Sequence, residues 1–302
     1  MNESVLSFKD KYFGDKNFYK MTLTIAIPII IQNLLTNLVS MADNIMVGQL
    51  GTNQMSGVAI INQLFFVFNL LVFGGMSGAG LFSAQYFGQK NHNGVRNVFR
   101  MKILIGITII AISISVMIFL HEPLINMFLH EGSSSGNIQE TFNYAKNYLY
   151  IMVIGIAPFV ISNCYNTTLK ESGQTVVPMK AGVLAVVFDI VLNYIFIFGK
   201  LGFPAMGVVG AAIATVISRF VECGYLVIYT HIHSNDYPFI KHCYRTLKVP
   251  GSLVKKIIIT GAPLMLNEFL WAGGLTLQTQ ALSTKGLATV GGLNICNTIG
   301  NI

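Results

Sequence analysis

The sequence predicts an all-α, polytopic membrane protein: a six-helix bundle lobe followed by the first helices of a second lobe, related to it by a pseudo-two-fold axis. Hydrophobic residues make up 53% of the 302 positions and charged residues only 10%, whereas a soluble globular protein carries about 25% charged residues. The mean hydropathy is +0.62. This composition excludes a single water-soluble domain, a disordered chain and a disulfide-stabilised scaffold.

Apolar stretches long enough to cross a bilayer, which takes about 20 residues, recur along the chain. The first fits at 21–47, where Asp43 is the only charge, and the second at about 57–82. Residues 1–20 hold four lysines and three acids, too many for a cleaved signal peptide, so the first span is retained. The later spans follow at about 103–120, 147–168, 179–199, 207–230 and 257–277, and an eighth begins near 286.

Lysine and arginine alternate between the two ends of the spans. Fifteen lie in the N-terminal segment and near the second, fourth and sixth loops, three lie in the intervening loops, and Arg219 lies inside a span toward the cytoplasm. Because basic loops stay in the cytoplasm, we expect the N-terminus and the loops near Lys90 and Lys241 to be cytoplasmic and the loop near Ser134 to be external. We interpret the basic loops as solvated segments beside the membrane. They explain the net charge of +7 without a nucleic-acid partner.

An internal repeat indicates two lobes. With an offset of 235 residues, seven identities occur in about 45 positions, and Lys20 aligns with Lys255 and Pro28 with Pro263. Six spans separate the copies, so both enter the membrane in the same orientation, and two complete lobes would need about 450–470 residues. We therefore expect four parts: a cytoplasmic N-terminus at 1–20, an N-lobe at 21–230, a cytoplasmic inter-lobe loop at 231–256 and the start of a C-lobe at 257–302.

Acidic residues inside the spans are candidates for function, because a charge in a bilayer is costly. Asp43 lies toward the outer end of the first span, where it is either functional or an interfacial cap or loop residue. Asp189 lies four residues before Asn193, so both share one helix face. There they could serve an ion site or a hydrogen bond between packed helices.

Two further acids lie in the sixth and seventh spans. Glu222 follows Arg219 by three residues, a spacing that favours a structural ion pair on one helix face. Glu268 lies near the middle of the seventh span, five residues after Pro263, as either a functional carboxylate or a hydrogen-bonding group at a kink.

Other residues in the spans indicate features of helix geometry and not a catalytic site. Pro28, Pro158 and Pro263 interrupt apolar stretches, and each is either a hinge or a static kink. No Ser/His/Asp or Cys/His set lies within the spans and no Walker motif is present, so we do not expect an enzyme. The cysteines form no CxxC or CxxH pattern, which indicates free thiols and no metal site. Small residues in the second span favour close helix packing: Gly74, Gly75, Gly78 and Gly80.

Several motifs resemble those of the MATE transporters, the multidrug and toxic compound extrusion family. Residues 43–51 (DNIMVGQLG) resemble the end of the family's first helix, and 83–89 (SAQYFGQ) resemble its motif after the second helix. The resemblance covers nearly the whole chain and implies twelve helices in two lobes, with drug export driven by inward Na⁺ or H⁺. Four further stretches of the sequence resemble the family's fourth loop, its fifth and sixth helices and the start of its second lobe. They are 169–179 (LKESGQTVVPM), 192–199 (LNYIFIFG), 207–215 and 263–271 (PLMLNEFLW).

The resemblance also implies a cation site in the N-lobe. Some MATE proteins build it from an aspartate on the first helix, an asparagine and an aspartate on the fifth, and a threonine on the sixth. Asp43, Asn193 and Thr215 match three of these positions. Ile197 occupies the fourth, and Asp189 is the candidate to replace the missing acid. Carboxylate, amide and hydroxyl oxygens suit a hard cation such as Na⁺, and H⁺ can compete for the carboxylate.

Other family members rely on a glutamate of the seventh helix, for which Glu268 is the candidate. We expect a monomeric exporter of lipophilic, often cationic compounds, working by alternating access in the cell membrane. It would contact lipid and need only Na⁺ or H⁺ as coupling ion, without a cofactor. The alternative is a lipid-linked saccharide flippase of a related two-lobe fold, which a strongly basic cavity would favour. A membrane-embedded enzyme would need a catalytic cluster that the spans do not contain.

Overall fold

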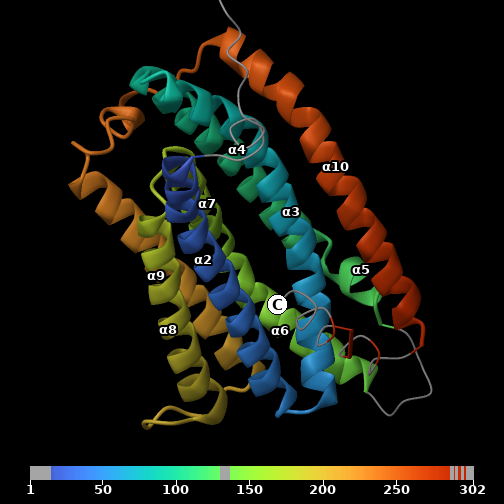
Figure 1. The fold of residues 1–302 in the computed structure, drawn as a ribbon. Helices are drawn as coiled ribbons and strands as arrows, with labels where there is room; N and C mark the ends of the chain where they lie inside the picture. The colour runs from blue at the N-terminus through green and yellow to red at the C-terminus, as the bar shows by residue number, and fades with distance from the viewer. Residues whose placement is uncertain (1–14, 130–136, 286–288, 290–291, 294–295, 297–302) are drawn as a thin grey trace, which may run out of the picture.

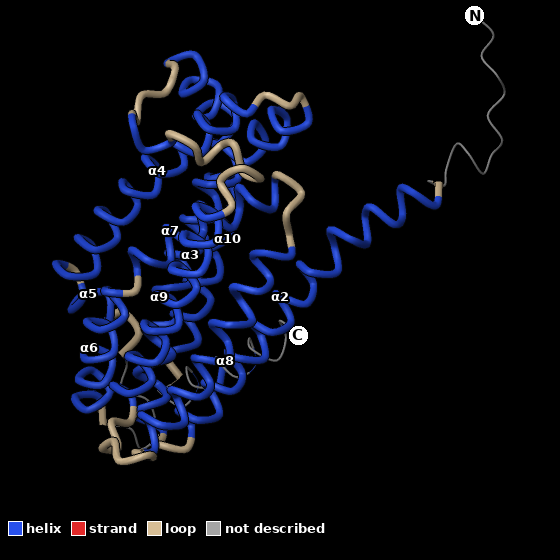
Figure 2. Tube along the Cα trace, turned by 90° about the vertical axis from the view of Figure 1, so that its left-hand side faces the viewer, coloured by secondary structure: helices blue, strands red, loops and turns tan. Residues whose placement is uncertain are grey.

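In the computed structural model, residues 15–129, 137–285, 289, 292–293 and 296 are described, and all regular structure among them is helical (Figure 1, Figure 2). The all-α fold class is therefore confirmed. Most of the long helices run side by side as a bundle, and the first turns of α2 project beyond it (Figure 2). The elements are α2 (Lys16–Gly48), α3 (Thr52–Gly88), α4 (His92–Phe119), α5 (His121–Asn126), α6 (Ile138–Ile154), α7 (Ile156–Glu171), α8 (Val176–Phe198), α9 (Val208–Ile232), η1 (Cys243–Arg245) and α10 (Gly251–Ser283).

Six segments of the described chain are suited to cross a membrane. Helices α2, α3, α4, α8 and α9 are each long and apolar enough, and α6 and α7 together form a sixth segment. Their positions agree with those of the first six predicted spans, although most helices extend beyond the predicted ends. Helix α10 is not among these segments, so the seventh span stays a prediction, and the eighth begins outside the described residues.

Polar residues at the membrane ends explain why the helices exceed the apolar stretches. Asp15 accepts a hydrogen bond from the amide of Phe18 at 2.7 Å and starts α2. Asn91 likewise accepts from Gly94 at 2.9 Å and starts α4 well before its apolar stretch. Such caps satisfy amide groups that have no partner within the helix. Hydropathy marks the hydrocarbon part of a helix, whereas the caps determine its ends.

The fourth span is broken rather than straight. Helices α6 and α7 meet at Gly155, where the chain bends by 47°. Pro158 follows the break. In a continuous helix its ring would crowd the carbonyl of Ile154, four residues earlier, and it has no amide hydrogen to donate. Pro28 and Pro263, by contrast, lie inside continuous helices.

Helix α3 occupies the centre of the bundle. It packs against α4, α6 and α7, and also against α10, while α8 packs against α2 and α9 (Figure 1). The approach of α10 depends on small residues, because a Cβ atom on Gly78 would collide with the Cα of Gly261. Gly80 faces α7 instead, where a Cβ would collide with the carboxylate of Glu171. These contacts support the packing role of the glycines in α3.

Helices α2 and α10 match in length and in their position within the sequence repeat. Each spans 33 residues, and each contains a proline, Pro28 in α2 and Pro263 in α10. The start at Gly251 follows the start at Lys16 by the same 235 positions that separate the repeats in the sequence. Helix α2 packs on α8, and α10 packs on α3.

The segment after α9 is attached to the bundle. Arg96 of α4 donates hydrogen bonds to the carbonyl oxygens of Pro238 at 3.0 Å and Phe239 at 3.3 Å. Arg100, one turn later, donates to the carbonyl of Cys243 at 2.8 Å. These two arginines are half-buried rather than fully solvated, and their guanidinium groups fix the segment after α9 against α4. All four cysteines are free, as expected.

Candidate functional site

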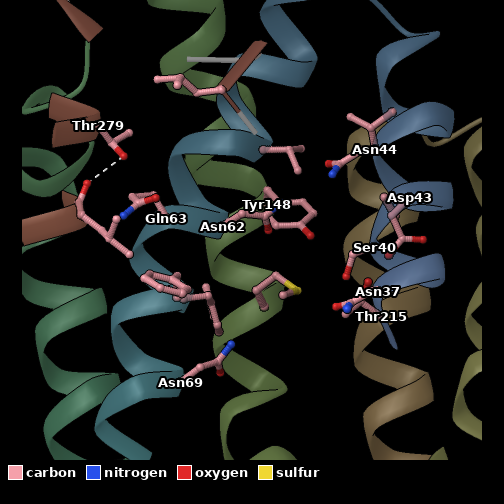
Figure 3. A pocket seen from close by; sticks show the side chains of 18 of the residues that line it. Asn37, Ser40, Asp43, Asn44, Asn62, Gln63, Asn69, Tyr148, Thr215 and Thr279 are labelled. Atoms are coloured by element: carbon pink, nitrogen blue, oxygen red, sulfur yellow. Dashed lines mark hydrogen bonds between the residues drawn. The ribbon is translucent and has the colours of Figure 1, made fainter. Parts of the chain in front are cut away.

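A cavity of about 550 Å³ lies among α2, α3, α6, α9 and α10 (Figure 3). In Figure 3, labelled side chains of α2 face those of α3 and Tyr148 of α6 across the open space. Amide groups and aromatic rings dominate the wall, with one carboxylate and one guanidinium. The polar and aromatic lining residues are Asn37, Ser40, Asp43, Asn44, Asn62, Gln63, Asn69, Thr215, Arg219, Gln278, Thr279, Phe65, Phe66, Tyr148 and Trp271.

Behind the cavity wall, two carboxyl groups converge on one amide. The Asn193 side-chain nitrogen donates to Asp43 Oδ1 at 2.7 Å and to Asp189 Oδ2 at 3.1 Å. Ser218 of α9 donates to the other Asp189 oxygen at 3.0 Å. Asp189 and Asn193 are buried, with 4% and 1% exposure, while Asp43 lines the cavity. Asp43 therefore connects a buried polar cluster on α8 and α9 to the open space.

This cluster retains an acceptor that no donor uses. The Asn193 side-chain oxygen is buried and has no hydrogen-bond partner among the described residues. Such a group is costly unless something pairs with it. Beside two carboxyl groups, an unpaired oxygen of this kind suits a cation ligand set. No group of three or more His, Cys, Asp or Glu side chains with metal-site geometry occurs in the described chain, so any ion here would depend on mixed oxygen ligands.

The structure brings most of the predicted site residues together. Asp43, Asp189 and Asn193 form one hydrogen-bonded set, with Asp189 one helical turn before Asn193 and Ile197 one turn after it. Thr215 lines the same cavity as Asp43. Glu268 does not join them: it is absent from the cavity wall and its Cβ lies on the side of α10 that faces Gly74 of α3.

Arg219 differs from its prediction in two ways. It stands near the middle of α9 and lines the cavity instead of lying toward the cytoplasm. The expected ion pair with Glu222 is also absent, because the pairs within 4.0 Å in the described residues involve other groups. The Arg219 guanidinium instead lies over two rings, 5.4 Å from the centroid of Phe65 and 5.0 Å from that of Phe159.

A buried ion pair escaped the sequence analysis altogether. Lys102, which was counted among the bases near the second loop, is fully buried in α4. Its ammonium group donates to both Glu171 carboxylate oxygens, at 2.7 and 2.6 Å, and to the hydroxyl groups of Thr167 and Thr168. Ser218 was also missed, because a serine in an apolar helix gives no signal of a site unless its neighbour is known.

These features define a class: a multi-pass helical membrane protein with a polar cavity between packed helices, as in membrane transporters. The MatE family model matches residues 28–195, and the chain belongs to this family. Membership agrees with the expectation of a transporter rather than an enzyme.

Individual relatives and solved structures are consistent with this family membership. A probable multidrug resistance protein NorM of Thermotoga maritima is 30% identical over 276 residues, which cover 91% of this chain and 57% of the relative. A crystal structure of a MATE protein in a bent conformation matches with 27% identity and a TM-score of 0.66, over 82% of this chain and 53% of that one. The multidrug transporter DinF-BH, solved in complex with a ligand, has 22% identity and a TM-score of 0.77, over 93% and 60% of the two chains, and supports the fold alone. The chain thus spans little more than half of these proteins.

Proposed function

We propose that this protein exports lipophilic, often cationic organic compounds across the cell membrane in exchange for Na⁺ or H⁺, by alternating access. The observation that carries the proposal is the polar cluster of Asp43, Asp189 and Asn193, which reaches the wall of a cavity large enough for a small molecule. The names of the relatives, which describe multidrug resistance, support the same conclusion.

The coupling ion would neutralise the paired carboxyl groups. Asp43 and Asp189 share one amide nitrogen, and two ionised carboxylates in one poorly hydrated site repel each other. A proton on either group, or a Na⁺ ion held by carboxylate oxygens and the free oxygen of Asn193, would relieve that repulsion. Loss of the ion leaves negative charge at Asp43, beside the cavity. Ion and cationic drug would then compete for one charge, which is the basis of exchange.

The rest of the wall would hold varied compounds. Drug-sized sites enclose about 300–1,000 Å³ and combine apolar walls with a few polar groups, and this cavity of about 550 Å³ falls in that range. Tyr148, Phe65 and Trp271 line it. Such faces attract organic cations through cation–π contacts. The amide groups can donate or accept hydrogen bonds and therefore do not select one substrate.

We further propose the organisation that the repeat implies. The N-lobe would comprise 21–230, the inter-lobe loop 231–256, and 257–302 would begin a C-lobe that completes a twelve-helix monomer. The matching bounds of α2 and α10 support this division. The excess of basic residues near the N-terminus and the even loops supports a cytoplasmic N-terminus. Glu268 would then belong to a second acidic position, in the other lobe.

The test is gradient-driven ethidium efflux by the full-length protein in proteoliposomes, under a Na⁺ gradient and then an H⁺ gradient. We expect one gradient to drive efflux and Asp43→Asn to abolish it, since the amide keeps size but not charge. Asp189→Asn should also impair efflux, and Glu268→Gln should impair it less than Asp43→Asn. Asp236→Asn, which removes an exposed carboxylate in a loop, is the matched control. Full efflux by both Asp43→Asn and Asp189→Asn would refute coupling through this cluster.

The flippase alternative gains one observation, since Arg219 lies in the cavity wall. A lipid-linked substrate carries pyrophosphate and would need several bases. Among the described lining residues Arg219 is the only base, and Asp43 lies in the same wall. Proteoliposomes with a fluorescent lipid-linked saccharide distinguish the functions: lipid scrambling without gradient-driven ethidium efflux would favour the flippase.

A further inference from the structure

Residues 237–248, which follow α9, form a segment with one buried apolar side and one exposed basic side. In Figure 1 this segment, in orange, lies between α9 and α10 and beside the start of α4. Its apolar side chains belong to the hydrophobic core of the bundle: Tyr237, Phe239, Ile240 and Cys243. Its three bases are exposed: Lys241, Arg245 and Lys248. We call these three residues the basic face.

The segment is held in place without the help of its own bases. Arg100 of α4 donates to the carbonyl oxygens of His242 at 2.9 Å and Cys243 at 2.8 Å, and Arg96 holds the carbonyl groups of the two residues before Ile240. In these bonds α4 supplies the donors and the segment supplies only backbone acceptors. The side chains of the basic face are therefore directed outward from a fixed backbone.

The charge of the basic face has no counter-charge in the described structure. Lys241 donates to the neutral side chain of Asn235 at 2.7 Å, and the ion pairs within 4.0 Å among described residues include no member of the face. No aspartate or glutamate occurs from 237 to 267. Lys255 and Lys256, near the start of α10, are also exposed. Such an unbalanced positive surface attracts anions.

The position of the segment indicates which anion it meets. Helix α9 is long and apolar enough to cross a membrane and ends at Ile232, five residues before the segment begins. Tyr244 and Leu247, which alternate with the bases, are 51% and 40% exposed. Bases beside exposed aromatic and apolar groups are typical of the membrane–water interface. A phospholipid headgroup suits both, because its phosphate pairs with bases while the region below it accepts apolar groups.

We propose that residues 237–248 form a docking surface for anionic phospholipid headgroups, with the basic face as its charged part. This inference goes beyond the proposed export function, because it concerns the surrounding lipid and depends neither on the cavity nor on the direction of insertion. The surface should prefer phosphatidylglycerol to phosphatidylcholine, because only the former carries a net negative charge. Salt should weaken this preference by screening.

A single tryptophan at position 247 reports which lipid occupies the surface. The full-length protein carries Leu247→Trp, with its other tryptophans replaced by phenylalanine, in vesicles that contain equal amounts of phosphatidylglycerol and phosphatidylcholine. Each lipid in turn is brominated near the headgroup, since bromine quenches tryptophan fluorescence only at short range. We expect phosphatidylglycerol to be enriched at this position by at least about threefold, as exposed bases beside an anionic surface would require.

Two controls separate this surface from the rest of the protein. Arg245→Gln/Lys248→Gln should reduce the enrichment by about half or more, because two exposed charges are lost. Lys200→Gln/Lys285→Gln removes two exposed lysines that follow α8 and α10, at the other end of these helices, and should leave the enrichment unchanged. A tryptophan in place of Leu201, which is 83% exposed at that end, should report little enrichment.

The outcomes decide between a lipid surface and other partners. Equal quenching by both lipids at position 247 would overturn the proposal and leave the basic face for a soluble acidic partner. Enrichment that both double variants reduce equally would also overturn it, because it would then follow from the net charge of the whole protein.

A second measurement needs no change of tryptophan. Mass spectrometry of the lipid retained by the purified full-length protein should find a higher ratio of phosphatidylglycerol to phosphatidylcholine than for Arg245→Gln/Lys248→Gln. Equal ratios would contradict the docking surface. Neither measurement involves efflux, so failure of this proposal is distinguishable from failure of the proposed function.

Discussion

Removal of one partner of the Lys102–Glu171 pair should destabilise the helix bundle strongly. Lys102 is fully buried, and its three donors are used by Glu171 at 2.6–2.7 Å, Thr167 at 3.0 Å and Thr168 at 3.3 Å. Glu171 is 18% exposed at its side chain. Truncation of one partner of a buried pair leaves the other charge unpaired and costs about 3–5 kcal/mol. We expect this loss for both Lys102→Met and Glu171→Gln.

The double variant Lys102→Met/Glu171→Met should be more stable than either single variant. Replacing a whole buried pair with apolar groups is often nearly neutral, because the cost of removing two charges from water disappears with their attraction. The pair of His121 and Glu122, separated by 3.9 Å, in which the Glu122 side chain is 64% exposed, provides the matched control. Glu122→Gln should change stability by less than about 1 kcal/mol, as is typical of exposed pairs.

Thermal unfolding of the purified full-length protein in detergent measures these effects. A thiol-reactive fluorogenic dye detects unfolding, since Cys164 and Cys243 are buried and react only when the fold opens. With about 2–4 °C per kcal/mol for domains of this size, the single variants should lower the midpoint by roughly 6–20 °C. Single variants that unfold at the same midpoint as the unaltered protein would refute a stabilising pair. A double variant no better than the worse single one would refute the charge argument.

Three further predictions concern packing, ionisation and topology. Gly78→Ala should cost about 1–3 kcal/mol by forcing α3 away from Gly261, visible as a lower unfolding midpoint; an unchanged midpoint would contradict this contact. Burial raises the pKa of the Cys243 thiol to about 11 from 9.0. As the pH rises, the thiol of the unfolded protein loses its proton first, so the contribution of Cys243 to stability is present below about pH 9 and declines toward pH 11. Maleimide should therefore label Cys243 at pH 8 only after unfolding. In intact cells, an impermeant thiol reagent should label a cysteine at position 201, where Leu201 is 83% exposed, but not one at Lys241; the reverse pattern would contradict the orientation.

Hydropathy located the first six helical segments but not their ends or the bend in the fourth. An apolar run is a local property, and a bilayer requires the backbone within it to be helical. The helix ends depend on capping groups such as Asn91. The break at Gly155 could not be predicted, because the sequence does not show that two helices meet near Pro158, whereas Pro28 lies inside one helix. Proline alone does not distinguish these outcomes.

The acids of the candidate site could be selected from the sequence, because a charge within an apolar span is rare and because Asp189 and Asn193 have helical spacing. Their meeting with Asp43 depends on the packing of α2 against α8, which the sequence does not contain. The Arg219–Glu222 pair was predicted by the same spacing rule and is wrong. Spacing permits contact but does not direct a long side chain, and the aromatic rings over which Arg219 lies come from other helices.

The two charged systems of the helix bundle differ in how fully their atoms are paired. Every donor of the Lys102 ammonium has an acceptor, and both Glu171 oxygens are used, so this system is complete within the chain. Around the cavity, the Asn193 oxygen and Arg219 Nη1 remain unpaired among described residues. Unpaired buried groups are selected against unless something else binds them. Buried polar atoms without a partner also occur away from the cavity, for example at Ser83, Thr141 and Ser172, so the lack of a partner does not by itself mark a site. The Asn193 oxygen differs from these because it lies beside two carboxyl groups, where a cation would find further oxygen ligands.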